Sequence, residues 1–267
     1  MSAVRRAFVD LARGQIHYAA SGDRDAPPVL LLHQTPRSWA EYRDVLPLIG
    51  RRFHAIAVDT PGFGDSAPLQ GPASIERWAA AMIEFLDALA IGRIHLVGHH
   101  TGGVIAVEIA AANPARVASL VLSSTPFTDE AFRQERRKRP PIDAVEPRDD
   151  GSHLTALWQR RQPFYPSGRP ELLRAFVSDA LKVSGDVEDG HRAVAAYRIE
   201  DRIGRVIQPT LLLRAGGDPF AAPHAAAWQA HLPSARVVDI LGGMVPLPDQ
   251  LPQAFADAVL AFLQSRP

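Results

Sequence analysis

The chain contains no cysteine, so it has no disulfide framework, no thiolate nucleophile and no cysteine-based metal site. It also lacks an excess of either charge, because 29 Lys and Arg residues balance 29 Asp and Glu residues. Balanced charge creates no overall field that would attract nucleic acid or an anionic membrane. No apolar run reaches the roughly 18 residues that span a bilayer, and residues 1–13 lack the apolar core of a signal peptide. We therefore expect a cytoplasmic protein without nucleic-acid or membrane partners.

What the chain does contain is a series of short apolar runs, several of which end at a polar residue or a glycine. Strands buried on both faces have this pattern, because helices cover both sides of a parallel sheet. The apolar fraction of 46% is enough for a large core. The predicted strands are Ala7–Leu11, Gln15–Ala20, Pro28–Leu32, His54–Val58, Ile94–Val97, Val117–Leu122, Thr210–Leu213 and Arg236–Leu241.

Helical periodicity lies between these runs. Residues Ser74–Leu89 carry an apolar stripe, and Ser74 is a suitable N-cap. A short alanine-rich helix is predicted for Gly103–Asn113, where Pro114 would end it, and a last helix for Leu251–Gln264. The alternation of strand and helix predicts an α/β fold with a mostly parallel central sheet flanked by helices.

The alternation stops between residues 126 and 207. This stretch is rich in proline, and helical patterns return at Leu154–Arg161, Glu171–Leu181 and His191–Ile199. Its basic segment Arg133–Arg139 is surrounded by acidic residues, which favours a solvated helical surface over an anion site. We predict a core formed by residues 1–125 and 208–267, with residues 126–207 inserted as a helical lid.

A Gly-x-x-x-Gly turn follows the predicted strand at Ile94. Hydrolases of the G-x-S-x-G type carry a nucleophilic serine at the centre of such a turn. Here Gly98 and Gly102 are in place, and His100 stands where serine is expected. Histidine tolerates the unusual backbone angles of a tight turn better than a β-branched residue does. We therefore expect His100 to project its imidazole into a pocket, beside the amides of the following helix.

In its motifs and their order, the chain resembles the α/β-hydrolase superfamily, in the lid-containing branch of esterases, epoxide hydrolases and C–C hydrolases. The four matching segments are Leu31–Pro36, Asp59–Ser66, the turn at Gly98–Gly102, and Pro209–Pro219. The resemblance implies that Asp218 is the acid that orients a catalytic histidine. It also implies an oxyanion hole built from the backbone N–H groups of Thr35 and Thr101.

The triad implied by the resemblance is incomplete. Met244 occupies the place of the family's catalytic histidine, and no histidine follows His231. Loss of the serine or the histidine costs a serine hydrolase about 10⁶ in turnover, which makes acyl-enzyme chemistry improbable here. Asp218 then reaches His100 directly, reaches it through water, or is separated from it by Met244. The residues expected to contact substrate are His33, Gln34, Trp39 and Met244.

The leading hypothesis is an enzyme that acts on a small carbonyl-containing substrate such as an ester, a lactone or a diketone. His100 would act as a general base with Asp218, and lyase or decarboxylase chemistry remains open. The alternative is a catalytically inactive protein that binds a small molecule in the remains of the site. We expect no cofactor and no metal, since no carboxylate spacing accompanies His33, His99 and His100. A monomer or a homodimer is expected.

Overall fold

A sheet of eight strands forms the centre of the molecule in a computed structural model that describes residues 3–265. The strand order is β1-β2-β4-β3-β5-β6-β7-β8; β1 and β2 are antiparallel, β2 runs antiparallel to β4, and the remaining neighbours are parallel. The strands are β1 Arg5–Leu11, β2 Gly14–Ser21, β3 Pro28–Leu32, β4 His54–Val58, β5 Ile94–His99, β6 Val117–Ser123, β7 Thr210–Ala215 and β8 Arg236–Ile240.

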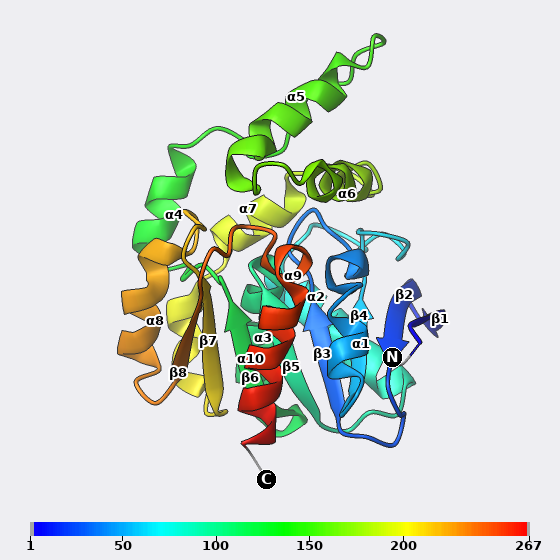
Figure 1. The fold of residues 1–267 in the computed structure, drawn as a ribbon, viewed down its shortest axis with the longest axis vertical. Coiled ribbons are helices and arrows are strands. Elements are labelled where there is room, and N and C mark those ends of the chain that lie inside the picture. Colours follow the sequence, from blue (N-terminus) through cyan, green and yellow to red (C-terminus); the bar gives the residue numbers. More distant parts are fainter. Residues whose placement is uncertain (1–2, 266–267) are drawn as a thin grey trace.

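Helices cover both faces of the sheet (Figure 1). Helices α2 (Ile75–Ala88), α3 (Thr101–Ala112) and α8 (Ala225–His231) bury apolar side chains in one core cluster. Helices α1 (Leu46–Ile49), α9 (Leu247–Gln250) and α10 (Pro252–Gln264) contribute to the other. The central strands therefore have apolar residues on both faces, which explains their continuous apolar runs.

Local sequence sets the ends of the helices close to the predicted places. The Ser74 side chain accepts a hydrogen bond from the backbone N–H of Arg77, so it caps α2. Helix α3 ends at Ala112, two residues before Pro114. Its start is two residues earlier than predicted, because the helix begins directly at the turn after β5.

Helices α4 to α7 lie between β6 and β7 in the sequence and above the carboxyl ends of the strands (Figure 1). Their bounds are α4 Glu130–Arg137, α5 Ser152–Arg161, α6 Pro170–Ala180 and α7 Asp189–Ala196. Part of this lid has a small core of its own, with Leu157, Tyr165, Leu172 and Phe176 buried together. Helix α5 extends away from the sheet, at the top of Figure 1.

One residue departs from the solvated helical surface expected for the lid. Arg133 is buried, although the segment Arg133–Arg139 was expected to be a solvated surface. Its guanidinium donates to Glu130 and Glu200, and to the carbonyl of Thr128. The long stem and five donors of arginine allow burial once carboxylates surround the head group, and Glu200 is distant in the sequence.

Within residues 3–265, the structure contains no helix that is long and apolar enough to cross a membrane.

A buried ion cluster ties the lid together. The Asp143 carboxylate accepts bonds from the Arg161 guanidinium, at 2.6 Å from Nε, and from His191 Nε2, at 2.7 Å. Burial alone would raise the pKa of the Asp143 carboxyl, but Arg161 and His191 outweigh it and hold this pKa well below its usual range. The backbone N–H groups of Asp143 and Ala144 donate to Glu188. The loop before α5 is thus fixed to α7.

We expect Asp143→Asn to destabilise the lid by about 3–5 kcal/mol at pH 7, because it leaves buried Arg161 without its counter-charge. Since the folded pKa of Asp143 is depressed, its contribution is complete above about pH 4 and is lost as the pH falls further. The difference between wild type and variant in urea unfolding must therefore shrink below about pH 4. Asp239→Asn, which breaks the exposed pair with Arg214, is the control and costs at most about 1 kcal/mol. A difference that stays constant down to pH 2 would contradict the assignment.

Candidate active site

The predicted site residues lie in loops that leave the carboxyl ends of neighbouring strands. His33 follows β3, His100 follows β5, and Asp218 follows β7. In the sheet, Leu32 pairs with Gly98, and His99 pairs with Ser123, so these strands end nearly level with one another. The parallel register therefore brings residues far apart in the chain to one edge of the sheet, beneath the lid.

The turn between β5 and α3 is tight. Only glycine fits two residues before and two residues after His100. His100 has a φ of 47° and a ψ of −113°, outside the regions favoured by most residues. A Cβ on Gly98 would lie 2.3 Å from the Gly102 carbonyl oxygen, and one on Gly102 would lie 2.0 Å from the Leu32 carbonyl oxygen. Both glycines are thus required for the close approach of α3 to β3 and β5, and this approach places His100 at the tip of the turn.

His100 and Asp218 are in direct contact. His100 Nε2 lies 2.6 Å from Asp218 Oδ2, and the Asp218 side chain is fully buried. Burial would raise the pKa of the Asp218 carboxyl, but the nearby His100 and the backbone N–H of Phe220 lower it below its usual value. Asp218 is therefore a carboxylate and an acceptor, so Nε2 of His100 carries the proton. When the ring is neutral, this tautomer leaves the lone pair on Nδ1.

Direct contact resolves the alternatives left open by the sequence. Met244 does not separate His100 from Asp218; its side chain packs near Gly217, and its backbone N–H donates to Gln250 at 2.7 Å. An imidazole is longer than a serine hydroxyl, so the residue at the tip of the turn spans the distance to the acid by itself. The contact needs no second histidine between the two residues.

His99, the last residue of β5, packs against His100 and does not take up a proton near pH 7. Its Nε2 donates to the Val245 carbonyl at 2.8 Å, and its Nδ1 lies 2.9 Å from the Ser123 hydroxyl. The rings of His99 and His100 meet edge to face, with centroids 4.6 Å apart. Burial, and then the adjacent His100, lower the pKa of His99 to about 3. His99 is therefore neutral near pH 7 and fixes the loop that contains Met244.

The backbone N–H groups of Thr35 and Thr101 have no hydrogen-bond acceptor among residues 3–265. Thr101 is the first residue of α3, and Thr35 lies in the loop after β3. The conformation of that loop depends on Gln34, which follows His33 directly. Its backbone N–H and its side-chain amide both donate to buried Glu41, at 2.9 Å and 2.5 Å. Glu41 thus holds the loop at two points.

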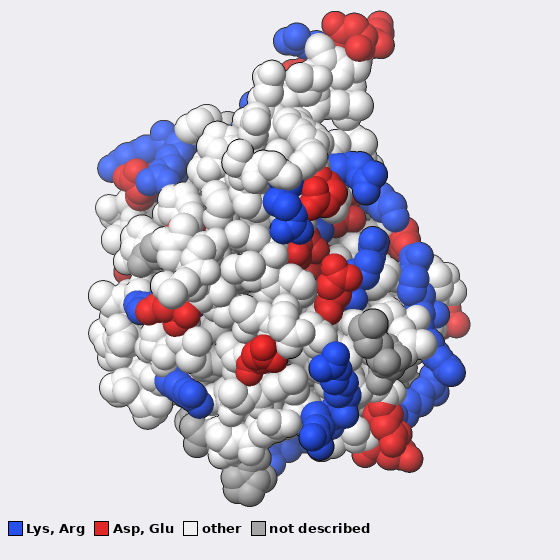
Figure 2. Space-filling view, in the orientation of Figure 1, with Lys and Arg blue, Asp and Glu red and all other residues white. Residues whose placement is uncertain are grey.

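A buried cluster of charges surrounds Arg37, which sequence reasoning did not find. Arg37 Nε donates to Asp179 of α6 at 2.8 Å, and Nη1 lies 2.6 Å from Asp249 of α9 and 3.8 Å from Glu41. Burial, together with the nearby Glu41 and Asp179, raises the pKa of Asp249 to about 7 despite Arg37. Charged side chains also gather at the surface where lid and core meet (Figure 2). The i,i+4 spacing of Arg37 and Glu41 could have indicated their ion pair. Asp179 and Asp249 are too distant in the sequence for a local pattern to link them to Arg37.

Two of the residues predicted to contact substrate, His33 and Trp39, have partners within the protein. His33 Nδ1 donates to the Gln34 carbonyl at 2.8 Å, and its Nε2 accepts from the Thr60 backbone N–H at 3.1 Å. No ring nitrogen of His33 is left for a ligand, and burial lowers its pKa. The Trp39 ring lies beside His17 and the guanidinium of Arg6. Contacts of a substrate with Gln34, Trp39, Met244 or the carbon atoms of the His33 ring stay predictions.

Among the described residues, two groups each bring three potential metal ligands together, and neither group includes His100. One group is His17, Asp59 and Asp65, and the other is Asp143, Glu188 and His191. Arginine or lysine side chains already occupy both: Asp65 pairs with Arg6 and Lys182, and Asp143 pairs with Arg161. These cations supply the positive charge that a metal would bring.

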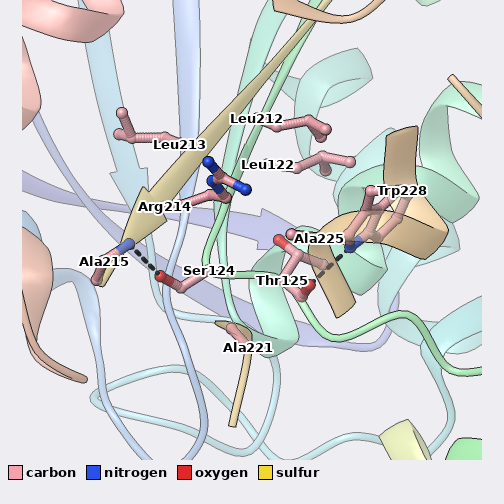
Figure 3. A pocket seen from close by; sticks show the side chains of 10 residues that line it. All are labelled: Leu122, Ser124, Thr125, Leu212, Leu213, Arg214, Ala215, Ala221, Ala225 and Trp228. Carbon is pink, nitrogen blue, oxygen red and sulfur yellow. Dashed lines mark hydrogen bonds between the residues drawn. The ribbon is translucent and has the colours of Figure 1, made fainter. Parts of the chain in front are cut away.

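A small cavity lies between β6, β7 and α8 (Figure 3). Its volume of about 20 Å³ fits a single water molecule. Two hydrogen bonds join residues that line it, from Ala215 N to Ser124 Oγ and from Trp228 Nε1 to the Thr125 carbonyl (Figure 3). It includes neither His100 nor Asp218, so it is not a substrate pocket.

Comparison with known families places these features in context. Residues 27–244 match the family model described as the alpha/beta hydrolase fold, which covers most of the chain. The chain belongs to the α/β-hydrolase family. Its mostly parallel sheet and its helical layers are those expected from the four motifs.

Among curated relatives of this α/β-hydrolase, the 2-hydroxy-6-oxononadienedioate/2-hydroxy-6-oxononatrienedioate hydrolase of Paraburkholderia xenovorans is 37% identical over 243 residues. That match covers 80% of this chain and 79% of the relative. Haloalkane dehalogenase 2 of Mycobacterium tuberculosis is 36% identical over 121 residues, but the match covers only 42% of that protein and 45% of this chain.

Solved structures show the same fold at lower identity. A hydrolase from Pseudomonas aeruginosa superposes on this α/β-hydrolase with a TM-score of 0.79 at 23% identity, covering 97% of this chain and 98% of that one. The enol-lactonase from Burkholderia xenovorans has a TM-score of 0.79 at 19% identity and covers 97% of this chain and 100% of its own.

Because His99 is neutral in the folded protein, we predict that the fold loses stability in acid. Since its pKa in the fold, about 3, lies below the ordinary value, the unfolded chain binds a proton that the folded chain does not. Stability therefore falls as the pH drops from about 6.5 towards 3, and His99 contributes up to about 1.4 kcal/mol per pH unit. We expect His99→Gln to unfold with a weaker pH dependence in that window, measured by urea titration. The exposed His231→Gln control keeps the wild-type slope, and an unchanged slope in His99→Gln would refute the burial argument.

Proposed function

We propose that this protein is an enzyme that hydrolyses a small carbonyl-containing substrate, such as an ester, a lactone or a β-diketone, with His100 as general base. The contact of 2.6 Å between His100 Nε2 and Asp218 Oδ2 carries this proposal. Asp218 fixes the tautomer, so Nδ1 accepts the proton. Histidine is the side chain best suited to proton transfer near neutral pH.

In the proposed reaction, His100 Nδ1 takes a proton from water while the water oxygen bonds to the carbonyl carbon. The imidazolium that forms is stabilised by the Asp218 carboxylate, which lies fully buried beside it. The bond from the carbonyl carbon to its leaving group then breaks, and the proton passes from Nδ1 to that group. An ester gives an acid and an alcohol, a lactone gives a single hydroxy acid, and a β-diketone gives an acid and a ketone.

The negative charge on the carbonyl oxygen needs donors, and we assign them to the backbone N–H groups of Thr35 and Thr101. Neither group has an acceptor within residues 3–265. Thr101 is also at the N-terminus of the 12-residue helix α3, whose dipole favours negative charge. Each such donor contributes about 10²–10³ in turnover in related chemistry.

Two further observations favour an enzyme over an inactive binding protein. The acid and the base are held together in a geometry that binding alone does not require. The hydrolase of Paraburkholderia xenovorans, which matches over 80% of this chain, is named for an oxo-dienedioate substrate. We therefore favour substrates with a ketone or ester carbonyl, including those that undergo carbon–carbon bond hydrolysis.

His100→Ala should lower turnover by about 10²–10⁴, because it removes the general base but leaves the donors in place. The assay is a screen with 4-nitrophenyl acetate, pentane-2,4-dione and acetoacetate, in which product formation is measured. His95→Gln is the matched control, since His95 lies on the same strand β5 but pairs with Ser119 far from the turn. Equal turnover in wild type and His100→Ala would overturn the proposal. Binding of these compounds without turnover in the wild type would instead indicate the inactive binding protein.

The double variant His100→Ser, Met244→His tests the donors separately. Serine returns a nucleophile to the turn, and histidine at position 244 supplies a base on the loop that the family resemblance implies. If Thr35 and Thr101 form an oxyanion hole, 4-nitrophenyl acetate hydrolysis should exceed that of either single variant by at least about 10-fold. Circular dichroism checks that all three variants fold. A folded double variant that is no faster than the single variants would argue against the donor pair.

A further inference from the structure

The lid touches the loop after β3 at a contact that only glycine permits. Gly190, in the first turn of α7, packs directly on Thr35: a Cβ at this position would lie 2.1 Å from Thr35 Oγ1 and 2.6 Å from Thr35 Cβ. Both residues are buried, and Thr35 Oγ1 makes no hydrogen bond within residues 3–265. The Thr35 side chain is therefore positioned by packing, and the backbone of α7 provides part of it.

The same loop is tied to a second lid helix by hydrogen bonds. Arg37 Nε and Ser38 Oγ both donate to the Asp179 carboxylate of α6, at 2.8 Å and 2.9 Å. Arg37 also donates its backbone N–H to the Gln34 carbonyl at 2.9 Å. The segment from Gln34 to Ser38 thus contacts α7 at Thr35 and α6 at Arg37 and Ser38.

From these contacts we infer that Gly190 is a positioning residue, through which the lid sets the orientation of the Thr35 backbone N–H. This inference rests on the proposed function, in which that N–H stabilises the oxyanion. Displacing a catalytic group by about 1 Å reduces turnover by about 10², so a contact that fixes the donor loop acts directly on the reaction rate. The lid is then part of the catalytic geometry as well as a cover over the site.

Gly190→Ala is the sharpest test, because alanine is a better helix former than glycine and suits the backbone of α7. We expect the helix to be retained, while the added methyl group displaces Thr35. Turnover of the best substrate in the screen should fall by at least about 10-fold, with KM changed less than threefold. Gly204→Ala is the matched control: Gly204 is in the same inserted segment, and a Cβ there meets nothing within 4 Å.

A second variant separates displacement of the loop from general damage. Thr35→Gly removes the three side-chain atoms that the new methyl group would meet, but it keeps the backbone N–H. The double variant Gly190→Ala, Thr35→Gly should therefore recover the turnover of Thr35→Gly alone. If the two changes instead multiply, the contact does not transmit the effect and the inference is wrong.

Amide hydrogen exchange gives a readout that does not need activity. Exchange in residues 33–42 should become faster in Gly190→Ala, stay at the wild-type rate in Gly204→Ala, and return to the rate of Thr35→Gly in the double variant. Unchanged exchange in Gly190→Ala, or faster exchange with unchanged turnover, would overturn the positioning role. If His100→Ala has full activity, the proposed function fails, whereas the exchange experiment still decides whether the lid positions the loop.

Discussion

A single hydrogen bond, from His100 Nε2 to Asp218 Oδ2, joins the turn after β5 to the loop after β7. The bond determines which ring nitrogen is protonated, and it places a charge partner beside the imidazole. It forms because the turn at Gly98–Gly102 pushes residue 100 outward from the sheet edge, and because an imidazole is long enough to reach the acid. The turn and the loop thereby bring a histidine and an aspartate into contact at the carboxyl edge of the sheet.

The surroundings of this pair are held by buried charge and by close packing. Arg37 connects the loop after β3 with α6 and α9, and Glu41 holds Gln34 in the same loop. Buried ion pairs of this kind add little net stability, since the cost of removing each charge from water offsets their attraction. Their effect is on geometry, because each charge accepts few arrangements of its neighbours. Gly190 adds a steric constraint to the same loop.

Much of the fold could be predicted from the chain itself. All eight strands lie at or within two residues of their expected bounds, since apolar runs and turn residues are local signals. The short helices α1, α8 and α9 were missed, because four to seven residues carry too little periodicity. Arg133 was misplaced because its partner Glu200 is 67 residues away, which no local pattern reveals.

By itself, the sequence determined the identity and order of the chemical groups: histidine at the turn, aspartate after β7, methionine at position 244, and glycines where the backbone must approach closely. These follow from residue type and from spacing along the chain. Only the tertiary structure decided that His100 contacts Asp218 without an intermediary, that His33 has no free nitrogen, and that Asp179, Asp249 and Gly190 reach the loop at Thr35. Some of these contacts join residues more than 200 positions apart in the chain, such as Arg37 and Asp249. The distances between such residues depend on how the lid packs over the sheet edge.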